Sequence, residues 1–116
     1  MTNSDSEIRV LITGAGGAGS LGRELMKSFQ LASQKYKIVA TNSSPTSIGL
    51  FETSFGYVIP KASSPQYLNT LLKICKKEKI QAVVGGSESE IKIIAKNMKV
   101  FSENGIEILS NTIDII

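Results

Sequence analysis

The chain has 116 residues, of which 41% are hydrophobic and 20% are charged, and its formal net charge is +3. It contains no histidine and one cysteine, which removes the commonest general base and excludes an internal disulfide or a cysteine zinc site. No apolar run approaches the roughly 18 residues that a membrane span needs, and the modest charge does not favour a nucleic-acid surface. We therefore expect one domain with a buried core and with no membrane or nucleic-acid partner.

Residues 1–7 are polar and acidic, which is the opposite of a signal peptide. We expect a disordered tail there, a single domain over residues 8–116 and a cytoplasmic location, with which a single cysteine is compatible. A further helix is predicted to begin near Ser110, but the chain ends at Ile116. We therefore expect these residues to be a fragment of a longer chain.

Five short apolar runs, bounded by glycine, proline and polar residues, predict strands. They cover residues 8–13, 37–41, 55–59, 80–84 and 106–109. Helical spacing of apolar residues predicts three helices between them. These cover residues 21–33, a segment from 64 onwards, and a segment from 87 to a stop at 104–105.

The second predicted helix begins with Ser64 as its cap and Pro65 at its first helical position. The side chains predicted to be buried in this helix are Leu68, Leu71, Leu72 and Cys75. Those predicted to form the apolar stripe of the third helix are Ile91, Ile94, Ala95 and Met98.

Strands alternate with helices along the whole chain, which predicts the α/β class. We expect an open, mostly parallel five-stranded Rossmann-like sheet with helices on both faces and right-handed crossovers. In such sheets ligands bind beyond the carboxyl ends of the strands. Three polar or glycine-rich segments are predicted to lie at that edge, namely residues 14–22, 42–46 and 85–90.

The glycine-rich stretch Gly14–Gly22 matches the dinucleotide fingerprint G-x-G-x-x-G in two registers. The fingerprint requires an acid at the end of the second strand, but Asn42 stands there. No acidic residue occurs between Glu24 and Glu52. An NAD(P)-binding oxidoreductase domain thus stays an alternative, as does a turn whose glycines only permit tight packing of strand and helix.

Two acidic residues, Glu88 and Glu90, follow Gly86 at a predicted helix N-terminus on the same edge. The pattern Ser87-x-x-Glu90 is a capping box, which gives Glu90 a structural explanation. Glu88 has no such explanation beyond the helix dipole. Of the two, Glu88 is therefore the better candidate for contact with a ligand.

Taken together, the glycine-rich turn and the segments 41–45, 57–60, 67–80 and 83–91 resemble a known family. They are similar to the N-terminal domain of ATP-grasp ligases, and most similar to those related to the carbamoyl-phosphate synthase large subunit and to the pyrrolysine biosynthesis ligase. The resemblance implies a Rossmann-like sheet that binds no dinucleotide and packs against domains that clamp ATP and magnesium. The parent reaction it implies activates a carboxylate as an acyl phosphate, which an amine or another nucleophile attacks.

By matching positions, the resemblance implies that the glycine-rich turn lines the floor of the substrate site and that an asparagine reaches into it. It also implies that two acidic residues contact the substrate or brace the central domain. The residues concerned are Gly14, Gly16, Gly17, Asn42, Glu88 and Glu90. The chain departs from the family pattern at Asn42 and Ser54, where aspartate is common, and at Gly85, where proline is frequent. These departures leave the substrate open.

The resemblance places no catalytic residue, metal ligand or cofactor in this chain alone, so we do not expect the isolated domain to turn over ATP. The partners it implies are C-terminal ATP-grasp domains and a small-molecule carboxylate or amine. A homodimer stays open. A non-catalytic interaction module is a further alternative to a ligase domain.

Overall fold

The computed structural model describes residues 7–14, 36–44 and 55–109. The strands in these ranges are β1 (Ile8–Ile12), β2 (Tyr36–Asn42), β3 (Phe55–Val58), β4 (Ala82–Val84) and β5 (Glu107–Leu109). The helices are α3 (Tyr67–Lys77), α4 (Glu88–Lys96) and α5 (Met98–Glu103). None of these helices is both long and apolar enough to cross a membrane.

The strands form one sheet in the order β3-β2-β1-β4-β5, and all four pairings are parallel. Val10 in the central strand β1 lies opposite Ile38 on one side and Ala82 on the other. The sheet is open, so the predicted fold class, an α/β Rossmann-like domain, is confirmed. Its order reverses direction between β1 and β4, which is the switch point at which such sheets form a crevice.

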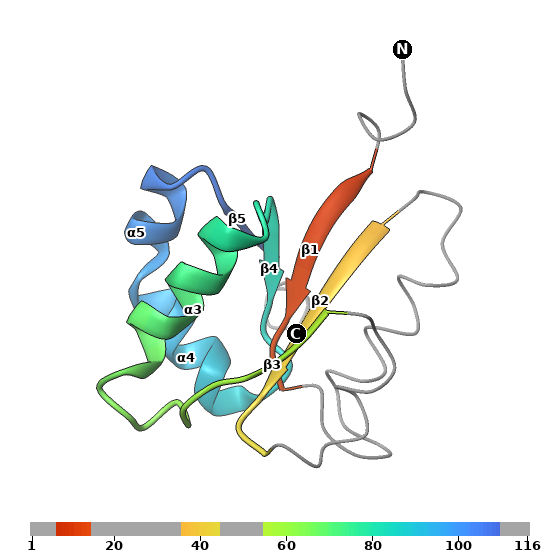
Figure 1. Cartoon of the computed structure of the whole chain (residues 1–116). Coiled ribbons are helices and arrows are strands. Elements are labelled where there is room, and N and C mark those ends of the chain that lie inside the picture. The colour runs from red at the N-terminus through yellow and green to blue at the C-terminus, as the bar shows by residue number, and fades with distance from the viewer. Residues whose placement is uncertain (1–6, 15–35, 45–54, 110–116) are drawn as a thin grey trace.

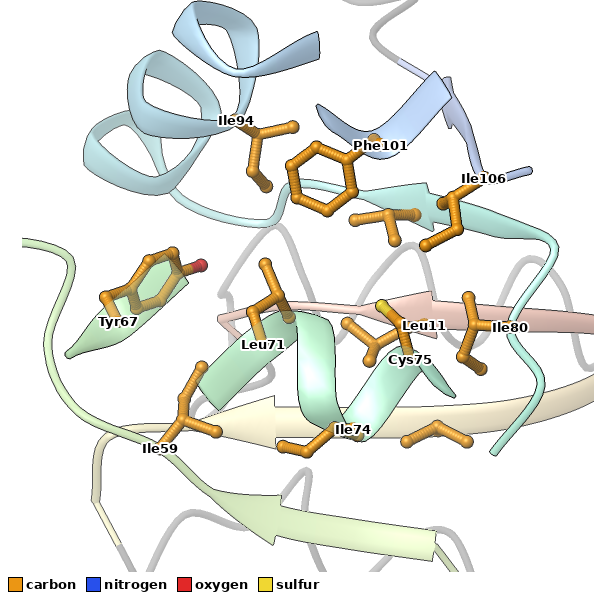
Figure 2. Close-up of a cluster of buried hydrophobic side chains, with 12 residues drawn as sticks. Leu11, Ile59, Tyr67, Leu71, Ile74, Cys75, Ile80, Ile94, Phe101 and Ile106 are labelled. Atoms are coloured by element: carbon orange, nitrogen blue, oxygen red, sulfur yellow. The ribbon is translucent and has the colours of Figure 1, made fainter. Parts of the chain in front are cut away.

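The helices α3, α4 and α5 all lie on the same face of the sheet (Figure 1). Apolar residues of these helices, of the sheet and of adjoining loops form a buried cluster, ten of whose residues are labelled in Figure 2. Leu71 and Cys75 of α3 face Leu11 of β1 within this cluster. Burial of the single thiol was predicted from the helical stripe, and it raises the pKa of Cys75 to about 12.

The opposite face of the sheet is apolar and buried as well. It is formed by Val10, Ile12, Ile38, Ala40, Ala82 and Val84. This alternation of faces follows from the period of two along a strand. The helix predicted over residues 21–33 lies outside the described residues, as do the segments 1–6, 45–54 and 110–116.

Helix α3 begins later than predicted, because Ser64 and Pro65 form a turn instead of its cap. The Ser64 hydroxyl accepts the Gln66 N–H at 3.1 Å, and the Ser64 carbonyl accepts the Tyr67 N–H at 3.1 Å. Gln66 is the N-cap, and no side chain caps the helix. The buried stripe also differs from the prediction, because Tyr67 and Ile74 belong to it, while Leu68 and Leu72 are only partly buried.

The segment predicted as one helix after residue 87 is two helices, α4 and α5. Asn97 interrupts it with a backbone at φ −118° and ψ 26°, and its side-chain amide donates to the Ile93 carbonyl at 2.8 Å. The change of direction moves Phe101 into the core and leaves Met98 48% exposed. The predicted stripe is therefore wrong at Met98 and at Ala95, which is exposed.

Candidate functional site

A cleft of about 570 Å³ lies at the carboxyl edge of the sheet. The described residues that line it come from the ends of β1, β2 and β4, from the segment after β3 and from the first turn of α4. They are Gly14, Asn42, Ser43, Pro60, Lys61, Ala62, Ser63, Gly86, Ser87, Ser89 and Glu90. The cleft thus occupies the place where parallel α/β sheets bind ligands.

Side-chain and backbone hydrogen bonds hold the ends of β1 and β4 together beneath this cleft. The Thr13 N–H donates to the Val84 carbonyl at 3.0 Å, which extends the strand pairing by one residue. The buried Thr13 hydroxyl then accepts the Gly86 N–H at 3.0 Å. Thr13 and Gly86, which are 73 positions apart in sequence, are therefore joined at one point beneath the cleft.

Gly14 is required at its position for two reasons. Its φ of +67° lies in the left-handed region, which side chains other than glycine rarely adopt. A Cβ there would also lie 2.9 Å from Glu90 Oε1 and 3.0 Å from the Gly86 carbonyl carbon. The glycine therefore permits the close approach of the β1 turn to the start of α4.

Glu90 is buried beside this contact, and both of its carboxylate oxygens accept hydrogen bonds. The Tyr67 hydroxyl donates to Oε2 at 2.7 Å, and the Ser87 hydroxyl donates to Oε1 at 2.6 Å. Only 8% of Glu90 is exposed. The side chain thus links the start of α3, the start of α4 and the turn after β1.

The environment of Tyr67 fixes the direction of proton donation in this network. Burial raises the pKa of Tyr67 well above 10, and the nearby negative charge of Glu90 adds to the rise. The hydroxyl therefore stays protonated at neutral pH and acts as a hydrogen-bond donor to the carboxylate.

The hydrogen bonds predicted for the capping box at Ser87-x-x-Glu90 are not the ones that the structure shows. Ser87 is the N-cap of α4, but its side chain makes no hydrogen bond to the helix backbone. Its hydroxyl instead donates a hydrogen bond to the Glu90 carboxylate. The reason is Tyr67, which holds the carboxylate on the side of α3, where it receives side-chain hydroxyls.

The structure brings three of the predicted site residues together at the cleft, namely Gly14, Asn42 and Glu90. Asn42 is half-buried, and its Oδ1 accepts the Ser44 N–H at 2.9 Å. Glu88 is exposed and is not among the described residues that line the cleft. Gly16 and Gly17 lie outside the described residues.

Sequence reasoning missed Thr13, Tyr67 and Lys61 at this site. Thr13 is the last residue of one predicted strand and Lys61 lies two residues after another, so their positions in the sequence could have indicated them. Tyr67 could not be found in this way, because its contact with Glu90 depends on how α3 packs against the sheet.

A family model described as the PylC-like N-terminal domain matches residues 10–109 of the chain. The match covers most of the sequence, so the chain belongs to this family, the pre-ATP-grasp domain of ATP-grasp ligases. The resemblance found in the sequence is thereby confirmed at that level. No curated protein matches the chain in sequence.

Solved structures with the same fold include enzymes of different kinds. Glycinamide-RNase-transformylase T from Mycobacterium tuberculosis is 12% identical, with a TM-score of 0.64 over 86% of this chain and 28% of that one. A dTDP-glucose 4,6-dehydratase from Bacillus anthracis, in complex with NAD, is 16% identical, with a TM-score of 0.60 over 87% of this chain and 36% of that one. A short chain dehydrogenase from Leptospira borgpetersenii with bound NAD+ is 13% identical, with a TM-score of 0.52 over 90% of this chain and 48% of that one.

This chain thus spans less than half the length of each of these three proteins. At these identities the likeness shows the fold alone.

Proposed function

We propose that this chain is the substrate-side N-terminal domain of an ATP-dependent carboxylate–amine ligase of the carbamoyl-phosphate synthase-like kind. In this proposal the cleft forms part of the floor of the substrate site. The observation that carries it is the position of the cleft, at the carboxyl ends of β1, β2 and β4 in a domain of this family. Proposed substrate contacts are Gly14, Asn42 and Glu90, with Gly16, Gly17 and Glu88 from the sequence.

The described residues do not fit a site for ATP and magnesium. The charged groups among those that line the cleft are Lys61 and Glu90, and two hydroxyls already occupy the Glu90 carboxylate. Among the described residues no group of three or more acidic or cysteine side chains could hold a metal ion. Because the chain belongs to a pre-ATP-grasp family, we assign ATP, magnesium and the phosphoryl-transfer step to C-terminal ATP-grasp domains of a parent protein.

The role left to this chain is to bind and orient a carboxylate or an amine substrate. The ends of β1 and β4, held together by the bond between Thr13 and Gly86, supply a preorganised surface for the substrate. Such preorganisation lowers the cost of binding. We place the parent enzyme in the cytoplasm, where ATP is available and the Cys75 thiol stays reduced.

The proposal is tested by narrowing the cleft in the parent protein. Ser89 is exposed in the first turn of α4 and lines the cleft, so Ser89→Trp places an indole there without disturbing the core. We expect the KM for the carboxylate or the amine to rise roughly tenfold, with a smaller change in kcat. ADP release is measured over a panel of carboxylate and amine pairs.

The control is Lys96→Trp, an exposed position on the same helix that is not among the described cleft residues. It should leave the kinetics unchanged. Absence of ADP release with every substrate pair would contradict the proposal and favour an interaction module. Saturable enhancement of NADH fluorescence by the chain would instead favour the oxidoreductase alternative.

A further inference from the structure

Lys61 is the cation among the described residues that line the cleft, whereas three other cations are engaged elsewhere. Lys37 pairs with Glu78 at 3.1 Å, Lys77 lies over the Tyr57 ring at 5.3 Å, and Arg9 donates to a backbone carbonyl. Lys61 is exposed, and its ammonium group makes no hydrogen bond or ion pair with any described residue.

The backbone on both sides of Lys61 is fixed. Before it, Ile59 is buried in the core and donates its N–H to the Asn42 carbonyl at 2.9 Å, and Pro60 has a restricted φ. After it, the Lys61 carbonyl accepts the Ser64 N–H at 2.9 Å and closes a turn. The side chain therefore leaves the main chain at a defined point on the rim of the cleft.

The neutral groups that line the cleft with Lys61 include hydroxyls and an amide that can donate hydrogen bonds. Ser43, Ser63 and Ser89 line the cleft with hydroxyls. The Oδ1 of Asn42 accepts a backbone N–H, and its side-chain NH₂ has no described acceptor, so it can donate to a ligand. The carboxylate of Glu90, the acidic group in the described lining, is buried and occupied by two hydroxyls.

We propose that Lys61 is a specificity-determining residue that binds an anionic oxygen group, a carboxylate or a phosphate, of the ligand held in the cleft. Charge-assisted hydrogen bonds to such a group are stronger than neutral ones, and serine hydroxyls complete its coordination. The inference rests on the proposed function only in taking this cleft as a substrate site.

The test is an NMR titration of the full ¹⁵N-labelled chain at constant ionic strength, with acetate in one arm and inorganic phosphate in the other. We expect saturable shifts of the Ser43, Ser63 and Ser89 amide signals. Lys61→Gln should weaken this binding roughly tenfold, whereas Lys61→Arg should largely retain it. Lys73→Gln, which removes an exposed charge from α3 away from the cleft, is the matched control and should bind like the wild type.

Saturation by acetate would assign the site to a carboxylate, and saturation by phosphate alone would assign it to a phosphorylated ligand. The inference is overturned if neither ion saturates, or if the two glutamine variants weaken binding equally through loss of net charge. Failure here leaves ADP release by the parent protein, and its sensitivity to Ser89→Trp, unaffected. Conversely, anion binding at Lys61 would persist in a protein without ligase activity, so the two proposals fail separately.

Discussion

Two glutamates of this domain, Glu90 and Glu78, each accept a hydrogen bond from a tyrosine hydroxyl, but their surroundings differ. Glu90 lies buried at the cleft, where its donors are the neutral hydroxyls of Tyr67 and Ser87. Glu78 directly follows α3, where its donors are Tyr57 and the ammonium group of Lys37. No described cation forms an ion pair with Glu90, whereas Glu78 has one at 3.1 Å.

The comparison indicates at which carboxylate the loss of a single hydrogen-bond donor destabilises the domain more. A buried acid without a counter-ion loses solvation, and each hydroxyl that donates to it offsets part of that loss. The Glu78 side chain is only 10% exposed, but the Lys37 ammonium group compensates its charge, so the loss of one hydroxyl donor there costs less. We therefore expect small changes around Glu90 to destabilise the domain more than equivalent changes around Glu78.

The largest effect is expected from Gly14→Ala, which inserts a Cβ against the Glu90 carboxylate. The new atom would lie 2.9 Å from Oε1, and the residue would have to keep a φ of +67°. We expect the free energy of unfolding to fall by about 3 kcal/mol, from backbone strain and overpacking together. Denaturant unfolding measures it.

Gly105→Ala is the matched control, because Gly105 has a similar φ of +72° but open space around its Cβ position. It should cost only about 1 kcal/mol, from strain alone. Equal losses in the two variants would show that the approach of Gly14 to Glu90 is not tight.

The next largest effect is a difference in stability between the phenylalanine variants of the two tyrosines. Tyr67→Phe removes one of the two donors to buried Glu90 and should cost about 2 kcal/mol. Tyr57→Phe removes the corresponding donor from Glu78 and should cost less than about 1 kcal/mol. Thermal and urea unfolding of both variants under one condition give the comparison, and the reverse order would contradict it.

The cost of Tyr67→Phe should also depend on pH. Because burial raises the pKa of Tyr67 above its usual value of 10, the contribution of its hydroxyl is complete below pH 10. It is lost as the pH rises further, since the unfolded chain ionises first. The difference between wild type and variant should therefore narrow above pH 10.

The smallest effect is expected at the acid end of the pH range. The hydrogen bond from Tyr57, followed by the contacts with Lys37, holds the pKa of Glu78 below its usual value of 4.5. The stabilisation is thus present above pH 4.5 and is lost as the pH falls through the lowered pKa. We expect Glu78→Gln to cost less than about 1 kcal/mol at neutral pH and nothing in strong acid, which unfolding curves at several pH values will show.

Strand positions and the edge that carries the cleft could be predicted from the sequence, because apolar runs and glycine turns are local signals. The glycine stop after α5 is confirmed for the same reason, with Gly105 in the left-handed region. The helix break at Asn97 could not be predicted, because no glycine or proline marks it. The hydrogen bond from its side-chain amide to the Ile93 carbonyl is known only from the structure.

The candidate site was less predictable, because its main contact joins residues that are far apart in sequence. Tyr67 and Glu90 are separated by 23 positions, and their hydrogen bond exists only when α3 and α4 pack on the same face. The capping-box pattern at Glu90 is local and gave a different bonding. Tertiary packing overrides such local preferences where a stronger partner is within reach.

The buried thiol of Cys75 allows local unfolding of this domain to be measured by thiol labelling. It is the single cysteine of the chain, it is 1% exposed, and its pKa is raised to about 12. A thiol-reactive dye therefore modifies it only when α3 separates from the sheet. A compound that binds the folded domain slows that modification by mass action. Candidate substrates can consequently be ranked by labelling rate on the unaltered chain.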